Sequence, residues 1–94
     1  MDLLSLPGGD IVAAGLADIA AGRETEASLL VRIGGPRLRR LGFPVPERTA
    51  DDVEDYEIRL YHLLGPEHGN NAHARYNALI RRLVSFERAA ACVR

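Results

Sequence analysis

The sequence predicts an all-α protein, a small bundle of four to five helices that ends in an antiparallel helical hairpin. Apolar residues recur at helical intervals in the C-terminal third, and glycine and proline separate the segments before it. Aromatic residues make up only 5% of the chain, so the core must consist of Leu, Ile, Val and Ala, which favours helices over a sheet. With 94 residues and no long linker, we expect a single helical domain over residues 1–94.

Two helices are predicted between the glycine pairs Gly8-Gly9 and Gly34-Gly35. The first covers residues 10–21, with Asp10 as its N-cap and Gly22 in the left-handed position that follows a helix. The second follows Thr25, a suitable N-cap, and ends at Gly34-Gly35. Each helix therefore has a start and a stop signal of its own.

A third, very short helix is expected from Arg37 to Leu41, begun by Pro36 and ended by Gly42. The prolines in residues 43–46 then predict an extended connector, because a residue that precedes proline avoids the α region. The short apolar run 29–33 also fits a strand, but no second strand candidate lies nearby.

The last two predicted helices form the hairpin. The fourth runs from Thr49 to Leu64 and is ended by Gly65-Pro66, and the fifth begins at Asn70 or Asn71 and reaches almost to the C-terminus. The apolar stripe of the fourth helix consists of Val53, Tyr56, Leu60 and Leu63.

An antiparallel arrangement brings complementary residues of the two helices together. It pairs the apolar stripes as Val53 with Leu83, Tyr56 with Ile80, and Leu60 with Tyr76. It also sets the acidic Glu54 and Asp55 near Arg81 and Arg82, so we expect the acidic and basic segments to pair within the fold.

The stripe of the fifth helix predicts a protein interface as well as a core. Its members recur at intervals of three and four residues: Tyr76, Leu79, Leu83, Phe86, Ala90 and Val93. About 22 residues would extend about 33 Å, well beyond the other helices. We therefore expect a homodimer through this helix, with the interface formed by Leu79, Leu83, Phe86, Ala90 and Val93.

A second functional hypothesis uses positive charge. The start of the fifth helix could hold an anion on its free N–H groups, helped by His68, Asn70, Asn71, His73 and Arg75. A basic stretch with Arg37, Arg39 and Arg40 could contribute to binding nucleic acid or a phosphorylated ligand. Helix capping and internal ion pairs also explain both features.

Other classes of function have little support in the sequence. The net charge is −1, the three histidines do not have zinc-ligand spacing, and no nucleophile accompanies the adjacent Glu67 and His68, so neither a cofactor nor an enzyme is indicated. The single Cys92 excludes an internal disulfide and suggests a small buried or interface residue in a reducing cytoplasm. No apolar run is long enough for a membrane span, and no signal peptide is expected. We therefore predict a cytoplasmic, non-enzymatic interaction module.

Overall fold

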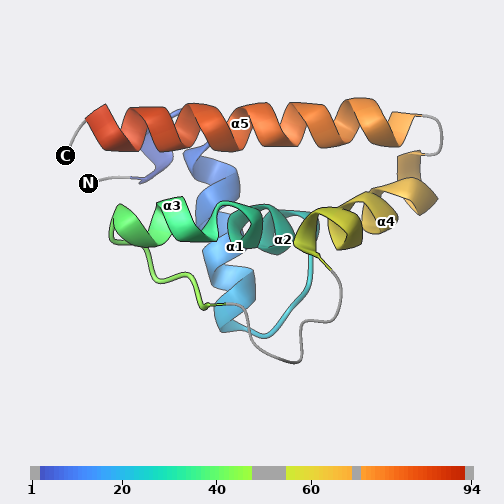
Figure 1. The fold of residues 1–94 in the computed structure, drawn as a ribbon, viewed down its shortest axis with the longest axis horizontal. Helices are drawn as coiled ribbons and strands as arrows, with labels where there is room; N and C mark the ends of the chain where they lie inside the picture. Colours follow the sequence, from blue (N-terminus) through green and yellow to red (C-terminus); the bar gives the residue numbers. More distant parts are fainter. Residues whose placement is uncertain (1–2, 48–54, 69–70, 93–94) are drawn as a thin grey trace.

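The computed structural model describes residues 3–47, 55–68 and 71–92, and within these ranges the secondary structure is entirely helical (Figure 1). The predicted all-α class is therefore confirmed. The elements are a 3-10 helix η1 (Leu3–Ser5) and five α-helices: α1 (Gly9–Ala20), α2 (Glu26–Ile33), α3 (Gly35–Arg40), α4 (Tyr56–His68) and α5 (Ala72–Cys92).

The long helix α5 is the support on which the rest of the fold is arranged. The shorter helices α3, α2 and α4 follow one another along it, and α1 crosses behind α2 (Figure 1). Helix α2 lies at the centre, in contact with α1, α3, α4 and α5. Its consecutive residues Ser28 to Val31 are all buried, as a helix surrounded by neighbours requires.

The predicted apolar stripe of α5 is confirmed in the described residues, but it packs inside the chain. Leu79, Leu83, Phe86 and Ala90 are at most 1% exposed, and Tyr76 is partly buried. Val93 lies outside the described residues. The shorter helices line up end to end along α5 and cover the described residues of its stripe, so the length of this helix does not by itself require a second chain (Figure 1).

Helix α4 differs from its prediction at its stripe and at its end. Its buried residues are Tyr56, Leu60 and Leu64, whereas Leu63 is 38% exposed. The helix also continues through Gly65-Pro66 to His68. Pro66 lies in the last turn, where it has no N–H to donate to the helix. The predicted N-terminal part of this helix, with Thr49 and Val53, lies outside the described residues, and Asp55 precedes the helix.

The contacts of α4 are shared between two neighbours. It packs against α5 and also against α2. Figure 1 shows α4 inclined to α5, with its start farther from α5 than its end. The ring of Tyr61 faces Tyr76 at 5.6 Å between centroids, and Tyr76 packs against the core cluster that contains Leu60. The predicted internal charge pairing is present with different partners, because Arg82 binds Asp10 of α1 through Nη2 at 2.7 and 2.8 Å.

The turn between α1 and α2 follows its sequence signals closely. Gly22 has φ 75°, and the two N–H groups after the helix end bond back to Ile19 and Asp18, the arrangement that glycine favours at this position. Thr25 caps α2, since its hydroxyl accepts from the Ser28 N–H at 3.1 Å and the Ser28 hydroxyl accepts from the Thr25 N–H at 2.8 Å. Asp10 is not an N-cap, because α1 begins earlier, at Gly9.

Candidate functional sites

The predicted anion site at the start of α5 is not assembled in the part of the chain that the structure describes. His68 is the last residue of α4, at the negative end of a helix dipole rather than at a helix start. Arg75 turns toward Glu26 of α2, with its Nε 3.7 Å from the carboxylate. His73 is exposed with its ring 6.2 Å from that of Tyr61, Asn71 is exposed, and Asn70 lies outside the described residues.

The predicted basic surface is largely occupied by contacts within the fold. Arg37 donates from Nε to the buried Glu87 at 2.9 Å. Arg39 donates from Nη1 to the carbonyl oxygens of Val45 and Pro46 at 3.3 and 3.1 Å. Arg40 is exposed. Nucleic-acid binding through this surface would therefore compete with the contacts that Arg37 and Arg39 make within the fold.

A group of large apolar side chains lies on the outside of α4. Ile58 is 45% and Tyr61 39% exposed, and together with Tyr76 of α5 they border a shallow cavity of about 390 Å³. Glu57 and His62 complete its border. We call Ile58, Tyr61 and Tyr76 the α4 patch. The sequence pattern does not indicate this surface, because Tyr76 belongs to the apolar stripe of α5, and Ile58 and Tyr61 lie outside the stripe predicted for α4.

A second cavity lies where the end of α1, the helix α2 and the start of α4 meet. Its volume is about 130 Å³, and three arginines line it: Arg23, Arg32 and Arg59. Both Arg32 and Arg59 have guanidinium groups near the ring of Tyr56, at 5.6 and 5.5 Å from its centroid. We call these three side chains and their cavity the arginine pocket.

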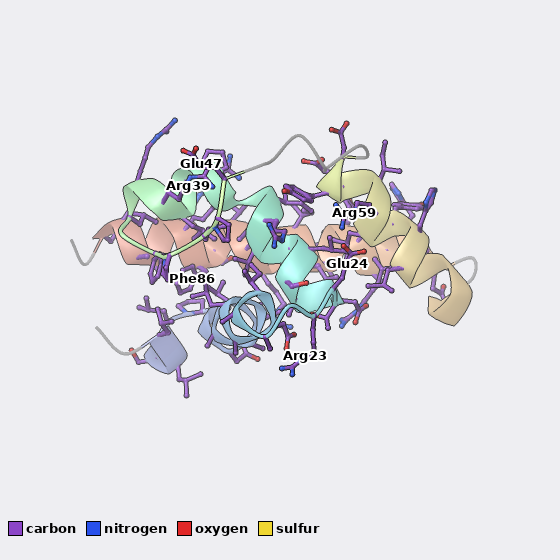
Figure 2. The ribbon with its side chains drawn as sticks, turned by 90° about the horizontal axis from the view of Figure 1, so that it is seen from below. Arg23, Glu24, Arg39, Glu47, Arg59 and Phe86 are labelled. Carbon is purple, nitrogen blue, oxygen red and sulfur yellow. The ribbon has the colours of Figure 1, made fainter. Side chains whose placement is uncertain are left out.

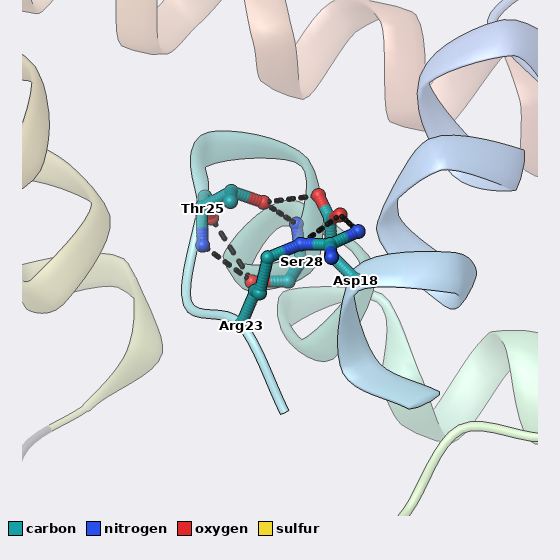
Figure 3. Close-up of polar contacts among 4 residues, drawn as sticks. All are labelled: Asp18, Arg23, Thr25 and Ser28. Carbon is teal, nitrogen blue, oxygen red and sulfur yellow. Dashed lines mark hydrogen bonds and ion pairs between the residues drawn. The ribbon is translucent and has the colours of Figure 1, made fainter. Parts of the chain in front are cut away.

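A polar network holds one edge of the arginine pocket in place (Figure 3). Asp18 accepts hydrogen bonds from the Thr25 hydroxyl at 2.7 Å and from Arg23 at 2.8 and 3.1 Å. The hydrogen bond from the Thr25 hydroxyl, followed by those from Arg23, lowers the pKa of the Asp18 carboxyl below its ordinary value. Thr25 is at the same time the cap of α2, so the network fixes Arg23 relative to both helices.

The arginine pocket could not be found from sequence spacing. Arg23, Arg32 and Arg59 belong to a loop and two different helices, and their convergence depends on how the helices cross. The one local signal was Thr25, which the sequence identified as a cap and which orients Asp18.

The described residues contain neither a cluster of metal ligands nor a helix that could cross a membrane. Within residues 3–47, 55–68 and 71–92, no group of three or more His, Cys, Asp and Glu side chains could hold a metal ion. In the same ranges no helix has both the length and the apolar character needed to cross a bilayer. Cys92 is exposed in the single chain, which corrects the expectation of a buried residue and leaves its place at an interface a prediction.

Comparisons with known proteins complete the description of the sites. Neither the protein-family models, nor the curated proteins, nor the solved structures contain a match to this chain.

Proposed function

We propose that the protein is a small, non-enzymatic interaction module that forms a homodimer through the α4 patch. The observation that carries the proposal is the exposure of Ile58 and Tyr61 side by side with Tyr76 on one surface. Grouped apolar side chains on a protein surface are typical of interaction sites. We place the module in the cytoplasm, where the exposed thiol of Cys92 would stay reduced.

The composition of the α4 patch suits protein contacts. Tyrosine is enriched at interfaces, because its rigid ring buries a large area at a small cost in side-chain entropy. The ring of Tyr61 is already positioned by Tyr76 and His73, at 5.6 and 6.2 Å between centroids. Little further ordering is therefore needed when a partner covers it.

A second copy of the chain is the partner that the order of side chains along α4 favours. If two α4 helices pair antiparallel about a two-fold axis between positions 58 and 61, Ile58 of each chain lies opposite Tyr61 of the other. The same register sets Glu57 opposite His62 in both halves of the contact. Each apolar side chain therefore meets an apolar side chain, and each Glu57 carboxylate meets an imidazole whose ring N–H can donate to it, as an isologous contact requires. Because the patch is small, we expect a weak dimer.

The oligomeric state tests the proposal directly. We expect sedimentation equilibrium to give an apparent mass that rises from monomer to dimer with protein concentration. Tyr61→Arg and Ile58→Arg should each keep the chain monomeric, because a two-fold contact would bring two added charges together. Leu4→Arg is the matched control: Leu4 is 68% exposed but lies on η1, so dimerisation should be unchanged. A wild-type chain that stays monomeric at every concentration would refute the homodimer.

Charge reversal tests the register. Glu57→Arg alone should weaken the dimer by placing Arg opposite His62, and His62→Glu alone should weaken it by placing two carboxylates together. The double variant should recover affinity, because the introduced arginine of each chain then lies opposite the introduced glutamate of the other. Additive losses in the double variant would contradict the antiparallel pairing about positions 58 and 61.

A further inference from the structure

The arginine pocket concentrates positive charge in a chain whose net charge is −1. Arg23 follows the end of α1, Arg32 lies in the last turn of α2, and Arg59 lies in the first turn of α4. The cavity lining contains three arginines and one acidic residue, Glu24. Asp18 pairs with Arg23 and Glu24 pairs with Arg59, which leaves the positive charge of Arg32 unbalanced among the described residues, so the space favours an anion.

The larger cavity beside the arginine pocket does not have this excess of positive charge. It has a volume of about 390 Å³ and shares Arg32 with the arginine pocket. Its charged lining residues are balanced, two arginines against two acidic residues: Arg32, Arg39, Asp55 and Glu57. An anion would therefore be attracted to the smaller cavity.

Arg32 is the arginine best placed to receive an external anion. Within the described part of the chain, its guanidinium contacts the ring of Tyr56, 5.6 Å from the centroid, and no carboxylate pairs with it. A guanidinium beside an aromatic face keeps N–H donors free for a bidentate contact with an oxyanion. Arg32 is thus oriented while its hydrogen-bonding capacity remains unused.

Arg59 is engaged by a group that a ligand could replace. Its Nη2 donates to Glu24, which lies on the loop between α1 and α2 with a side chain 51% exposed. Figure 2 shows these two side chains directed toward each other, with Arg23 farther out. An ion pair this exposed contributes little net stability, so an external anion can displace the carboxylate of Glu24.

We propose that the arginine pocket binds a single phosphate group through Arg32 and Arg59, with Arg23 at its rim, and that Glu24 occupies the site when the phosphate is absent. Guanidinium groups match the geometry of phosphate oxygens. A cavity of about 130 Å³ is well below the roughly 300 Å³ of a typical small-molecule pocket, so it admits one anionic group and not a whole nucleotide. Ser28 also lines the cavity, but its hydroxyl already bonds to Thr25.

This inference is independent of the proposed dimer and is tested by titrating the full chain at low ionic strength. Inorganic phosphate and O-phosphoserine serve as probes, and the arginine Nε–Hε resonances report binding. We expect saturable shifts at Arg32 and Arg59. Arg32→Gln should weaken binding by about tenfold. Glu24→Gln should tighten it, because the competing carboxylate is removed; a misfolded variant could not produce this gain.

The control removes the same charge elsewhere. Arg81→Gln changes an exposed arginine on α5, away from the pocket, and should leave phosphate affinity unchanged. Equal weakening by Arg81→Gln and Arg32→Gln would overturn the site in favour of general attraction to a positive surface. The absence of saturable shifts in both the wild type and Glu24→Gln would also overturn it. Tighter binding of O-phosphoserine than of inorganic phosphate would support the site and identify the natural ligand as a phosphate ester.

Discussion

Asp18 is the residue that joins the end of α1 to the cap of α2, and its contacts give it a pH dependence. The Thr25 hydroxyl and Arg23 both donate to its carboxylate and lower its pKa below the ordinary value of 3.8. A carboxyl with a lowered pKa in the folded state stabilises the fold above its unfolded pKa, and loses that effect as the pH falls through the folded pKa. We therefore expect the contribution of Asp18 to stability to disappear below pH 3.8.

Carboxyl resonances followed by NMR across an acid titration can measure this shift. Thr25→Val should raise the pKa of Asp18 toward its ordinary value, whereas Thr25→Ser should not, because serine keeps the hydroxyl donor. Asp10, in the first turn of α1, serves as the internal control. Its pKa is lowered by Arg82 of α5 and should not change in either Thr25 variant. An Asp18 pKa that is the same in Thr25→Val and in the wild type would contradict the assigned cause.

The crossing of α1 and α2 depends on one glycine. A Cβ added at Gly15 would lie 2.4 Å from the carbonyl oxygen of Ala27 and 2.4 Å from Cγ2 of Val31. Helix propensity alone predicts that Gly15→Ala stabilises the protein by about 1 kcal/mol. We expect the opposite, a loss of about 1 to 3 kcal/mol in the free energy of unfolding, because the two helices must move apart.

Urea unfolding of Gly15→Ala measures this balance. Ala17→Gly, on the exposed side of the same helix, is the control and should cost about 1 kcal/mol through propensity alone. If Gly15→Ala proved more stable than the wild type, the close approach of α1 to α2 would be wrong.

At the level of elements, the sequence was informative where structure is set locally. Gly22 ends α1 and Thr25 begins α2, because a left-handed turn and a capping hydroxyl depend on a few adjacent residues. The stripe of α5 also followed its periodicity. Pro66 misled the prediction, since α4 continues past it to His68. The convergence of Arg32 and Arg59 could not be predicted, because helix crossing leaves no periodic signal.

For the whole molecule, Phe86 distinguishes packing within the chain from packing between chains. Its ring is fully buried and lies 5.5 Å from that of Phe43. We expect Phe86→Ala to lose about 3 to 5 kcal/mol, a large part of the roughly 5 to 15 kcal/mol that stabilises a small domain. Tyr61→Ala, at an exposed position, should cost much less.

Both variants can be compared by urea unfolding over a range of protein concentrations. Because Phe86 is covered by its own chain, the loss of unfolding free energy caused by Phe86→Ala should not change on dilution. A loss that depends on concentration would instead assign Phe86 to an interface between chains.

The bond between Arg82 and Asp10 joins residues 72 positions apart, whereas α1 and α2 are neighbours in sequence. Contacts between distant residues form late, since a long loop must be closed before they are made. During synthesis, α1 and α2 can pair as soon as they emerge, but the apolar side chains that α5 covers have no partner until that helix has left the ribosome. Completion of this fold is therefore tied to the release of its last helix.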